Sequence, residues 1–82
     1  MTKEILPGRK MNKWFVYIIV KQTRLYVGIT TDLAHRLSQH HSKELLYFEG
    51  PILRDQAVKR EKEIKGWSSS KKRDLIVKFS QQ

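Results

Sequence analysis

A single uninterrupted apolar run constrains the fold of this chain most strongly. Every residue of the stretch Trp14–Val20 is aromatic or β-branched, which is typical of a strand covered on both faces. The run is far shorter than the roughly 20 apolar residues that cross a bilayer, and no signal-peptide pattern precedes it. We therefore expect a buried central strand in a cytoplasmic protein.

The remaining pattern predicts a small α+β domain. A polar turn joins the first strand to a second at 25–29 as an antiparallel hairpin, and a third strand at 45–49 is expected to end at Gly50-Pro51. Helices are expected from the Thr30–Asp32 cap to about residue 41, over 53–65 with Gly66 at the C′ position, and from the Ser68–Ser70 cap to about residue 79. The predicted fold is a small three-stranded antiparallel sheet flanked by helices, in the order β-β-α-β-α-α. It forms one domain at 13–82 after a flexible extension at 1–12.

The charge balance indicates a polyanionic partner. The 82 residues hold 17 Lys and Arg against 8 Asp and Glu, a net charge of +9, and such a field on a small surface attracts nucleic acid. The absence of cysteine excludes disulfides, thiolate metal sites and cysteine nucleophiles. We expect DNA as the partner, with candidate phosphate contacts on the last two helices, although solvated surface is the alternative for each of them. These candidates are Lys59, Lys62, Lys65, Lys71, Lys72 and Arg73.

One acidic residue falls on the apolar side of the second predicted helix. At about 100° per residue, Glu61 lies within an arc formed by Ala57, Val58 and Ile64. A carboxylate among apolar side chains is costly unless it is paired, and a metal ion or a basic side chain is the usual partner. Glu61 is therefore a metal ligand, half of a structural salt bridge, or a residue at the edge of a partly hydrated helix. Glu63 faces the opposite side and is expected on the surface.

Two further pairs of residues carry candidate chemistry. Arg36 and His40 are four residues apart on the first predicted helix, so they stack on one side of it and could hold a phosphate. Tyr17 lies on the first strand, and Tyr26 lies on the second beside Gly28, whose missing side chain leaves room for a ligand. The ordinary alternatives are a surface pair for Arg36 and His40 and core packing for the tyrosines.

Read together, these residues resemble the GIY-YIG nuclease family. Its two signature tripeptides appear as Val16-Tyr17-Ile18 and Tyr26-Val27-Gly28, followed by the family's helix start at Thr30–Leu33 and then by Arg36 and His40. The stretch 57–67 resembles the last part of the small stand-alone bacterial members, in which Glu61 occupies the metal-ligand position. Such members are similar to the incision domain of the excision-repair nuclease, which implies a link to DNA repair. The resemblance covers about residues 13–80.

The resemblance implies a DNA endonuclease that hydrolyses phosphodiester bonds with one divalent cation, Mg²⁺ or Mn²⁺. The catalytic residues it implies are Tyr17, Tyr26, Arg36, His40 and Glu61. Glu61 would hold the metal, and Arg36 would neutralise charge on the phosphoryl oxygens. Either tyrosine could take the proton from the attacking water, with Tyr26 favoured, and His40 would orient that tyrosine or share its proton. Since the chain has no room for a separate DNA-reading module, we expect single-stranded or branched DNA as the substrate.

The chain departs from the family pattern at two places. Val16 replaces the first glycine of the first tripeptide, and residues 42–44 form a connection that is usually longer. A loop missing beside the cleft would weaken the grip on the substrate, which leaves two alternatives open. One is a non-catalytic nucleic-acid-binding module with the same fold. The other is a protein-interaction domain that uses Trp14, Trp67 and the basic helices.

Overall fold

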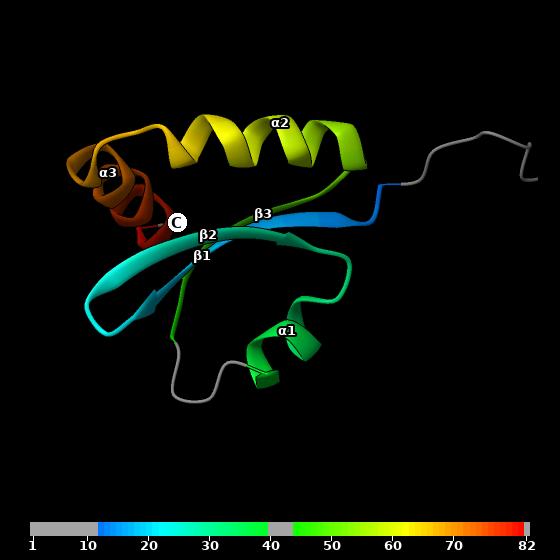
Figure 1. The fold of residues 1–82 in the computed structure, drawn as a ribbon, viewed down its shortest axis with the longest axis horizontal. Coiled ribbons are helices and arrows are strands. Elements are labelled where there is room, and N and C mark those ends of the chain that lie inside the picture. Colours follow the sequence, from blue (N-terminus) through cyan, green and yellow to red (C-terminus); the bar gives the residue numbers. More distant parts are fainter. Residues whose placement is uncertain (1–11, 40–43, 82) are drawn as a thin grey trace, which may run out of the picture.

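The computed structural model describes residues 12–39 and 44–81, which form one sheet and three helices (Figure 1). The strands are β1 (Trp14–Lys21), β2 (Arg24–Thr30) and β3 (Glu44–Ile52), and the helices are α1 (Leu33–Gln39), α2 (Arg54–Lys65) and α3 (Ser69–Ser80). The predicted order β-β-α-β-α-α and the α+β fold class are confirmed. The extension expected at 1–12 lies outside the described residues except for Asn12.

The sheet places β1 at its centre, in the order β2-β1-β3. Both pairings are antiparallel, with Tyr17 opposite Gly28 on β2 and opposite Phe48 on β3, and with Ile19 opposite Tyr26. Successive side chains of a strand point to opposite faces, and directly opposite residues share a face. Tyr17 and Tyr26 therefore lie on the same face of the sheet.

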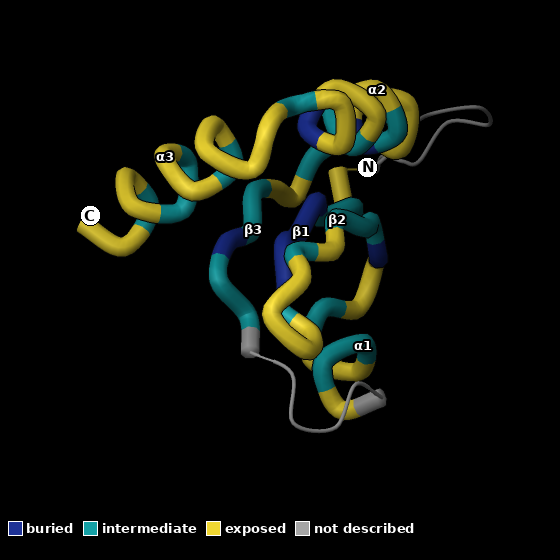
Figure 2. The backbone as a smooth tube through the Cα atoms, turned by 60° about the vertical axis from the view of Figure 1, so that its left-hand side comes forward, coloured by how far each residue is buried: buried dark blue, intermediate teal, exposed yellow. Residues whose placement is uncertain are grey.

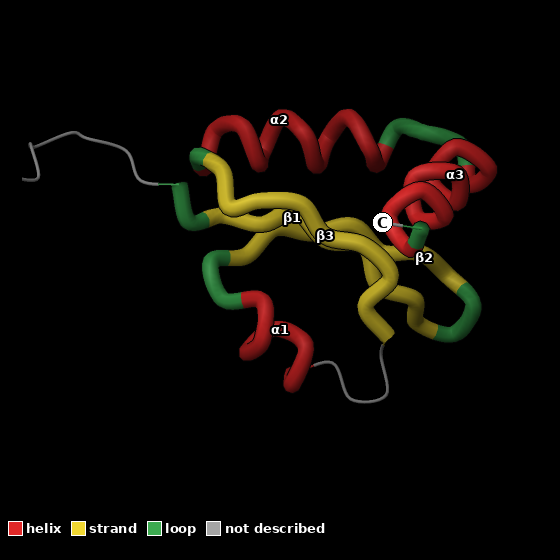
Figure 3. Tube along the Cα trace, turned by 180° about the vertical axis from the view of Figure 1, so that it is seen from behind, coloured by secondary structure: helices red, strands yellow, loops and turns green. Residues whose placement is uncertain are grey.

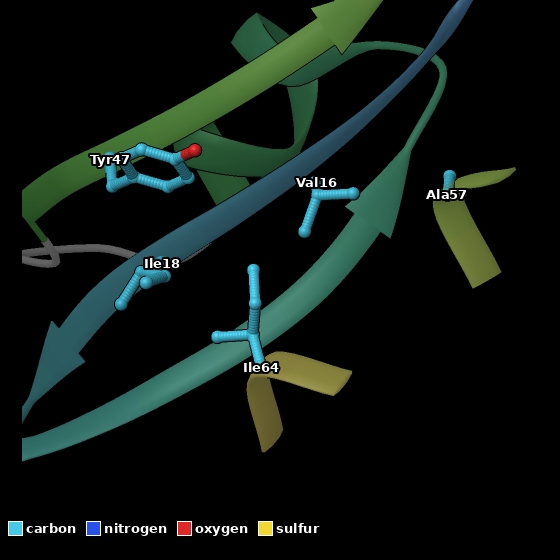
Figure 4. Close-up of a cluster of buried hydrophobic side chains, with 5 residues drawn as sticks. All are labelled: Val16, Ile18, Tyr47, Ala57 and Ile64. Atoms are coloured by element: carbon cyan, nitrogen blue, oxygen red, sulfur yellow. The ribbon is translucent and has the colours of Figure 1, made fainter. Parts of the chain in front are cut away.

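Different helices cover the two faces of the sheet. α2 packs against β1 and β2 on one face, while α1 lies on the other (Figures 1 and 3). The face under α2 holds the core, and Figure 2 shows that buried positions are concentrated in β1. The buried cluster, drawn in Figure 4, consists of Val16, Ile18, Tyr47, Ala57 and Ile64. Three residues of α3 pack against it: Leu75, Ile76 and Phe79.

Side-chain caps fix the starts of α1 and α3. Thr30 Oγ1 accepts a hydrogen bond from the Asp32 N–H at 3.1 Å, and Asp32 Oδ1 accepts one from the His35 N–H at 3.0 Å. Ser68 caps α3 by accepting a hydrogen bond from the Lys71 N–H at 3.2 Å. The predicted helix starts are therefore confirmed, because each cap satisfies a backbone donor that the helix cannot.

Two predicted ends of elements are wrong. β3 does not stop at Gly50-Pro51 but continues to Ile52, which pairs with Trp14. Gly50 has a φ of 128°, and a Cβ there would lie 2.5 Å from the Trp14 carbonyl oxygen, so glycine lets β3 pass close to β1 instead of ending it. Gly66 is the C-cap of α2 in the right-handed region, at φ −79°, rather than a C′ glycine, because the chain turns at once towards α3. The end predicted for the first helix, near residue 41, lies outside the described residues.

Candidate active site

A cavity of about 290 Å³ lies on the face of the sheet that carries α1. Three elements contribute to its described lining, which consists of Tyr17, Ile19, Lys21, Tyr26, Val27 and Arg36. This lining combines two phenols with two cations, and none of the described residues in it is acidic. Such a lining can hold an anionic group by charge-assisted hydrogen bonds, with phenolic hydroxyls beside it.

The two tyrosines of the cavity differ in depth. Tyr17 is 6% exposed, and its ring lies over Gly28, where a Cβ would come within 2.6 Å of the Tyr17 hydroxyl oxygen. The space above Gly28 is therefore filled by Tyr17, which corrects the expectation that it is left for a ligand. Tyr26 is 43% exposed, so it is the phenol that solvent reaches more readily.

The two cations enter the cavity from different elements. Arg36 projects from α1, whereas Lys21 is the last residue of β1 and places its Nζ 6.0 Å from the centroid of the Tyr26 ring. Among the side chains that the structure describes, no carboxylate forms an ion pair with either of them. Lys21 was not predicted as a site residue, although the alternation of β1 puts it on the same face as Tyr17 and could have revealed it.

Glu61 lies on α2, the helix that covers the opposite face of the sheet (Figures 1 and 3). Its side chain is 20% exposed, and its Oε2 lies 3.2 Å from Lys65 Nζ one turn later. The neighbours Ala57 and Ile64 are fully buried, which confirms that Glu61 lies on the apolar side of the helix. Glu63 is 54% exposed, as predicted.

The predicted catalytic residues are thus only partly brought together. Tyr17, Tyr26 and Arg36 meet in one cavity, and Glu61 is not among the residues that line it. His40 lies outside the described residues. The sheet itself explains this division, because β1 and β2 separate the face under α2 from the face that carries the tyrosines.

The predicted phosphate contacts lie on α2 and α3, outside the lining of this cavity. Lys72 is half-buried and the other five are exposed. Two of these exposed cations have partners within the chain: Lys65 pairs with Glu61, and Lys71 Nζ lies 4.4 Å from the centroid of the Trp67 ring. These cations add to the positive field around the protein, but they do not form part of the cavity.

A second polar network joins β3 to α2. The Tyr47 hydroxyl donates a hydrogen bond to Glu49, and Arg60 donates from Nε to Glu49 at 3.0 Å and from Nη1 to Glu63 at 2.8 Å. Burial, together with the bond to Glu49, raises the pKa of Tyr47 to about 12. Burial works against the charge on Arg60, but the hydrogen bonds to Glu63 and Glu49 outweigh it and raise the Arg60 pKa. The charges of this network are satisfied internally, which indicates a structural role.

A family comparison covers both the cavity and α2. The family model described as the GIY-YIG catalytic domain matches residues 13–74, a range that includes Tyr17, Tyr26, Arg36 and Glu61. This chain belongs to the GIY-YIG family. Membership places it among nuclease-type domains, in agreement with the resemblance seen in its two tripeptides.

Relatives of this GIY-YIG protein occur in several microorganisms. A UPF0213 protein of Desulfotalea psychrophila is 38% identical over 84 residues, which cover 85% of this chain and 76% of that protein. A UPF0213 protein of Cronobacter sakazakii is 37% identical over 80 residues, with 82% and 84% covered, and one of Haloquadratum walsbyi is 34% identical over 74 residues, with 74% and 83% covered. These names state no activity. No solved structure matches the chain significantly.

Of the two departures from the GIY-YIG pattern, the structure describes Val16 but not the whole of the short connection. Val16 is fully buried in the core under α2, so the side chain that replaces glycine points away from the cavity. The short connection at 42–44 lies outside the described residues except for Glu44 at the start of β3.

No helix within the described ranges has the length and apolarity that a membrane span requires.

A metal site in this GIY-YIG domain would have to be built on one carboxylate. The described part of the chain contains no group of three or more His, Asp or Glu side chains placed to share an ion. Mg²⁺ is commonly held by one or two carboxylates together with waters and substrate phosphates, so the hard oxygen donors of Glu61 fit it. Because Lys65 lies 3.2 Å from Glu61 Oε2, a metal ion there would compete with the Lys65 ammonium.

Proposed function

We propose that this GIY-YIG protein is a metal-dependent endonuclease that hydrolyses phosphodiester bonds in DNA and prefers single-stranded or branched DNA. The cavity lined by Tyr17, Tyr26, Lys21 and Arg36 carries the proposal. The described lining holds two cations and no carboxylate, which supports an anion from outside as the ligand of the cavity. Family membership makes the backbone phosphate of a nucleic acid the natural anion.

Arg36 binds and neutralises the scissile phosphate in this proposal. Its planar, positively charged guanidinium can donate two parallel N–H bonds to phosphoryl oxygens. Donors that are already in position stabilise the charge that develops on these oxygens in the transition state. Arg36 therefore contributes to catalysis as well as to binding.

Tyr26 accepts the proton of the attacking water. Its 43% exposure supports this role, since solvent reaches it more readily than Tyr17, which is 6% exposed. Tyr17, held over Gly28, positions the reacting groups by hydrogen bonding. His40 would share the proton with a tyrosine.

Glu61 would hold Mg²⁺ or Mn²⁺ together with water and a substrate phosphate. A divalent cation supplies Lewis-acid polarisation of a phosphoryl oxygen and stabilises the leaving oxygen. The cations on α2 and α3 add to the field that attracts DNA, and binding should weaken with salt accordingly. They are Lys59, Lys62, Lys65, Lys71, Lys72 and Arg73.

The protein-interaction alternative has less support from the structure. The guanidinium carbon of Arg54 lies 5.4 Å from the centroid of the Trp14 ring. Arg60 and Lys71 both place their charged groups over the ring of Trp67. Both tryptophans are therefore already covered by cations of the same chain. A catalytically inactive nucleic-acid-binding module remains as an outcome of the following test.

The test is a cleavage assay on labelled single-stranded, branched and duplex oligonucleotides, with Mg²⁺ or Mn²⁺ and with a chelator. We expect cleavage of the first two substrates, lost on chelation. Glu61→Gln should slow cleavage by about 100-fold or more while keeping most DNA binding, and Glu63→Gln, on the exposed side of the same helix, should cleave like the unmodified protein. Binding without cleavage under every metal condition would contradict the enzyme and favour the inactive module. Undiminished cleavage by Glu61→Gln would remove Glu61 as the metal ligand.

A further inference from the structure

The hairpin between β1 and β2 presents a cation to the cavity face. Lys21 lies opposite Arg24, in the same register that places Ile19 opposite Tyr26. Residues two apart on a strand share a face, so Lys21 points to the side on which Tyr17 lies. The lining of the cavity agrees with this, because it includes Lys21 together with Tyr17 and Ile19.

The turn fixes where Lys21 enters the cavity. Gln22 and Thr23 both have positive φ, at 51° and 69°, which is the geometry of a tight two-residue hairpin turn. Lys21 is four residues from Tyr17, about 13 Å along the strand at the usual rise per residue. The ammonium thus comes from the turn end of the hairpin, whereas the guanidinium of Arg36 comes from α1.

Lys21 differs from the basic side chains of α2 in its described contacts. Arg60 and Lys65 are each paired with a glutamate, at 2.8 to 3.2 Å. Lys21 Nζ lies 6.0 Å from the centroid of the Tyr26 ring, and no carboxylate among the side chains that the structure describes pairs with it. A lysine in an open cavity whose described lining contains no carboxylate is suited to an anion from solution.

We propose that Lys21 binds a second phosphate of the substrate strand, flanking the phosphate held by Arg36, so that the strand runs along the β1–β2 hairpin. The identity of the substrate rests on the proposed function. The inference adds that the site recognises a polynucleotide strand by two of its phosphates. Each phosphate binds one cation, Lys21 on β1 or Arg36 on α1. Lys21 is then a binding residue that sets how the strand lies across Tyr26.

The test measures binding of the full chain to a fluorescent single-stranded oligonucleotide over a series of salt concentrations, in the presence of a chelator. Lys21→Met should lower the slope of log affinity against log salt by about 0.7, the contribution of one neutralised phosphate on a single strand. Lys21→Arg should keep the slope, because the charge remains. Lys78→Met is the matched control. It removes the same charge from an exposed position on α3, the helix that packs against β3, and should keep the slope.

Equal slopes for Lys21→Met and the unmodified protein would overturn the inference. An equal decrease of the slope in Lys21→Met and Lys78→Met would overturn it as well. Because no metal is present, the result can be read whether or not the protein cleaves DNA. A selective loss in Lys21→Met supports the inference even if cleavage fails, and cleavage with no selective loss supports only the proposed function. Failure of the unmodified protein to bind DNA at low salt would overturn both.

Discussion

The hydroxyl of Tyr17 reaches its place because Gly28, directly across the hairpin, has no side chain. A Cβ at Gly28 would lie 2.6 Å from the Tyr17 hydroxyl oxygen and 2.7 Å from the ring carbon that carries it. Gly28 has an ordinary strand conformation, so the requirement for glycine comes from this contact and not from the backbone. The second signature tripeptide therefore supports the tyrosine of the first.

Gly28→Ala should displace the Tyr17 ring from the cavity. We expect cleavage to slow at least as much as in Tyr17→Phe, measured under single-turnover conditions, while circular dichroism shows the sheet retained. Gly66→Ala is the control, since a Cβ there meets its nearest atom at an ordinary 3.5 Å. Wild-type cleavage by Gly28→Ala would show that the position of Tyr17 does not matter to the reaction.

Strand alternation is enough to place Tyr26 and Gly28 on one face of β2, but not to show what fills the space over Gly28. The register of β1 against β2 adds Tyr17 to that face. That the Tyr17 ring itself occupies the space over Gly28 depends on a cross-strand contact that the order of residues does not reveal. The role of Lys21 was within reach of the same alternation.

At the scale of elements, the network of Tyr47, Glu49 and Arg60 joins β3 to α2. Its tyrosine is 8% exposed and donates a hydrogen bond to a carboxylate, so the charged phenolate is disfavoured in the folded state. The pKa of Tyr47 accordingly rises from 10.0 to about 12. The folded state therefore keeps this proton at pH values at which the unfolded chain loses it.

This difference predicts a loss of stability at alkaline pH. The contribution of Tyr47 is fully present below its unfolded pKa near 10 and is lost as pH rises through about 12. Denaturant unfolding at a series of pH values should therefore show the unmodified protein losing more stability between pH 10 and 12 than Tyr47→Phe, which has no proton to lose there. The comparison cancels the titration of the lysines, which both proteins share. Parallel stability curves would contradict the raised pKa.

The starts of the helices were more predictable than the end of β3, because helix starts depend on local contacts and the end of β3 on a long-range one. Helix starts depend on local hydrogen bonds, such as the one from the Lys71 N–H to Ser68. The continuation of β3 to Ile52 depends on its pairing with Trp14, far away in the sequence. Gly50 and Pro51 are ordinary signals of a strand end, and long-range pairing overrides them here.

At the scale of the whole molecule, the sheet separates two functions. Its face under α2 holds the core (Figures 3 and 4). Its other face holds the cavity lined by Tyr17, Tyr26 and Arg36. Helical periodicity showed that Glu61 is on the apolar side of α2, but it could not show which face of the sheet α2 covers. The sequence therefore identified the candidate residues, and the topology decided which of them meet.

The central claim is that this cavity hydrolyses phosphodiester bonds, and single-turnover cleavage at saturating protein tests it most directly. Arg36→Met should slow the cleavage step by about 100-fold or more, because it removes the donor that stabilises the developing phosphoryl charge. Arg54→Met removes the same charge at the exposed start of α2, outside the cavity lining, and should cleave at the unmodified rate. Cleavage by Arg36→Met at the rate of Arg54→Met would contradict the claim.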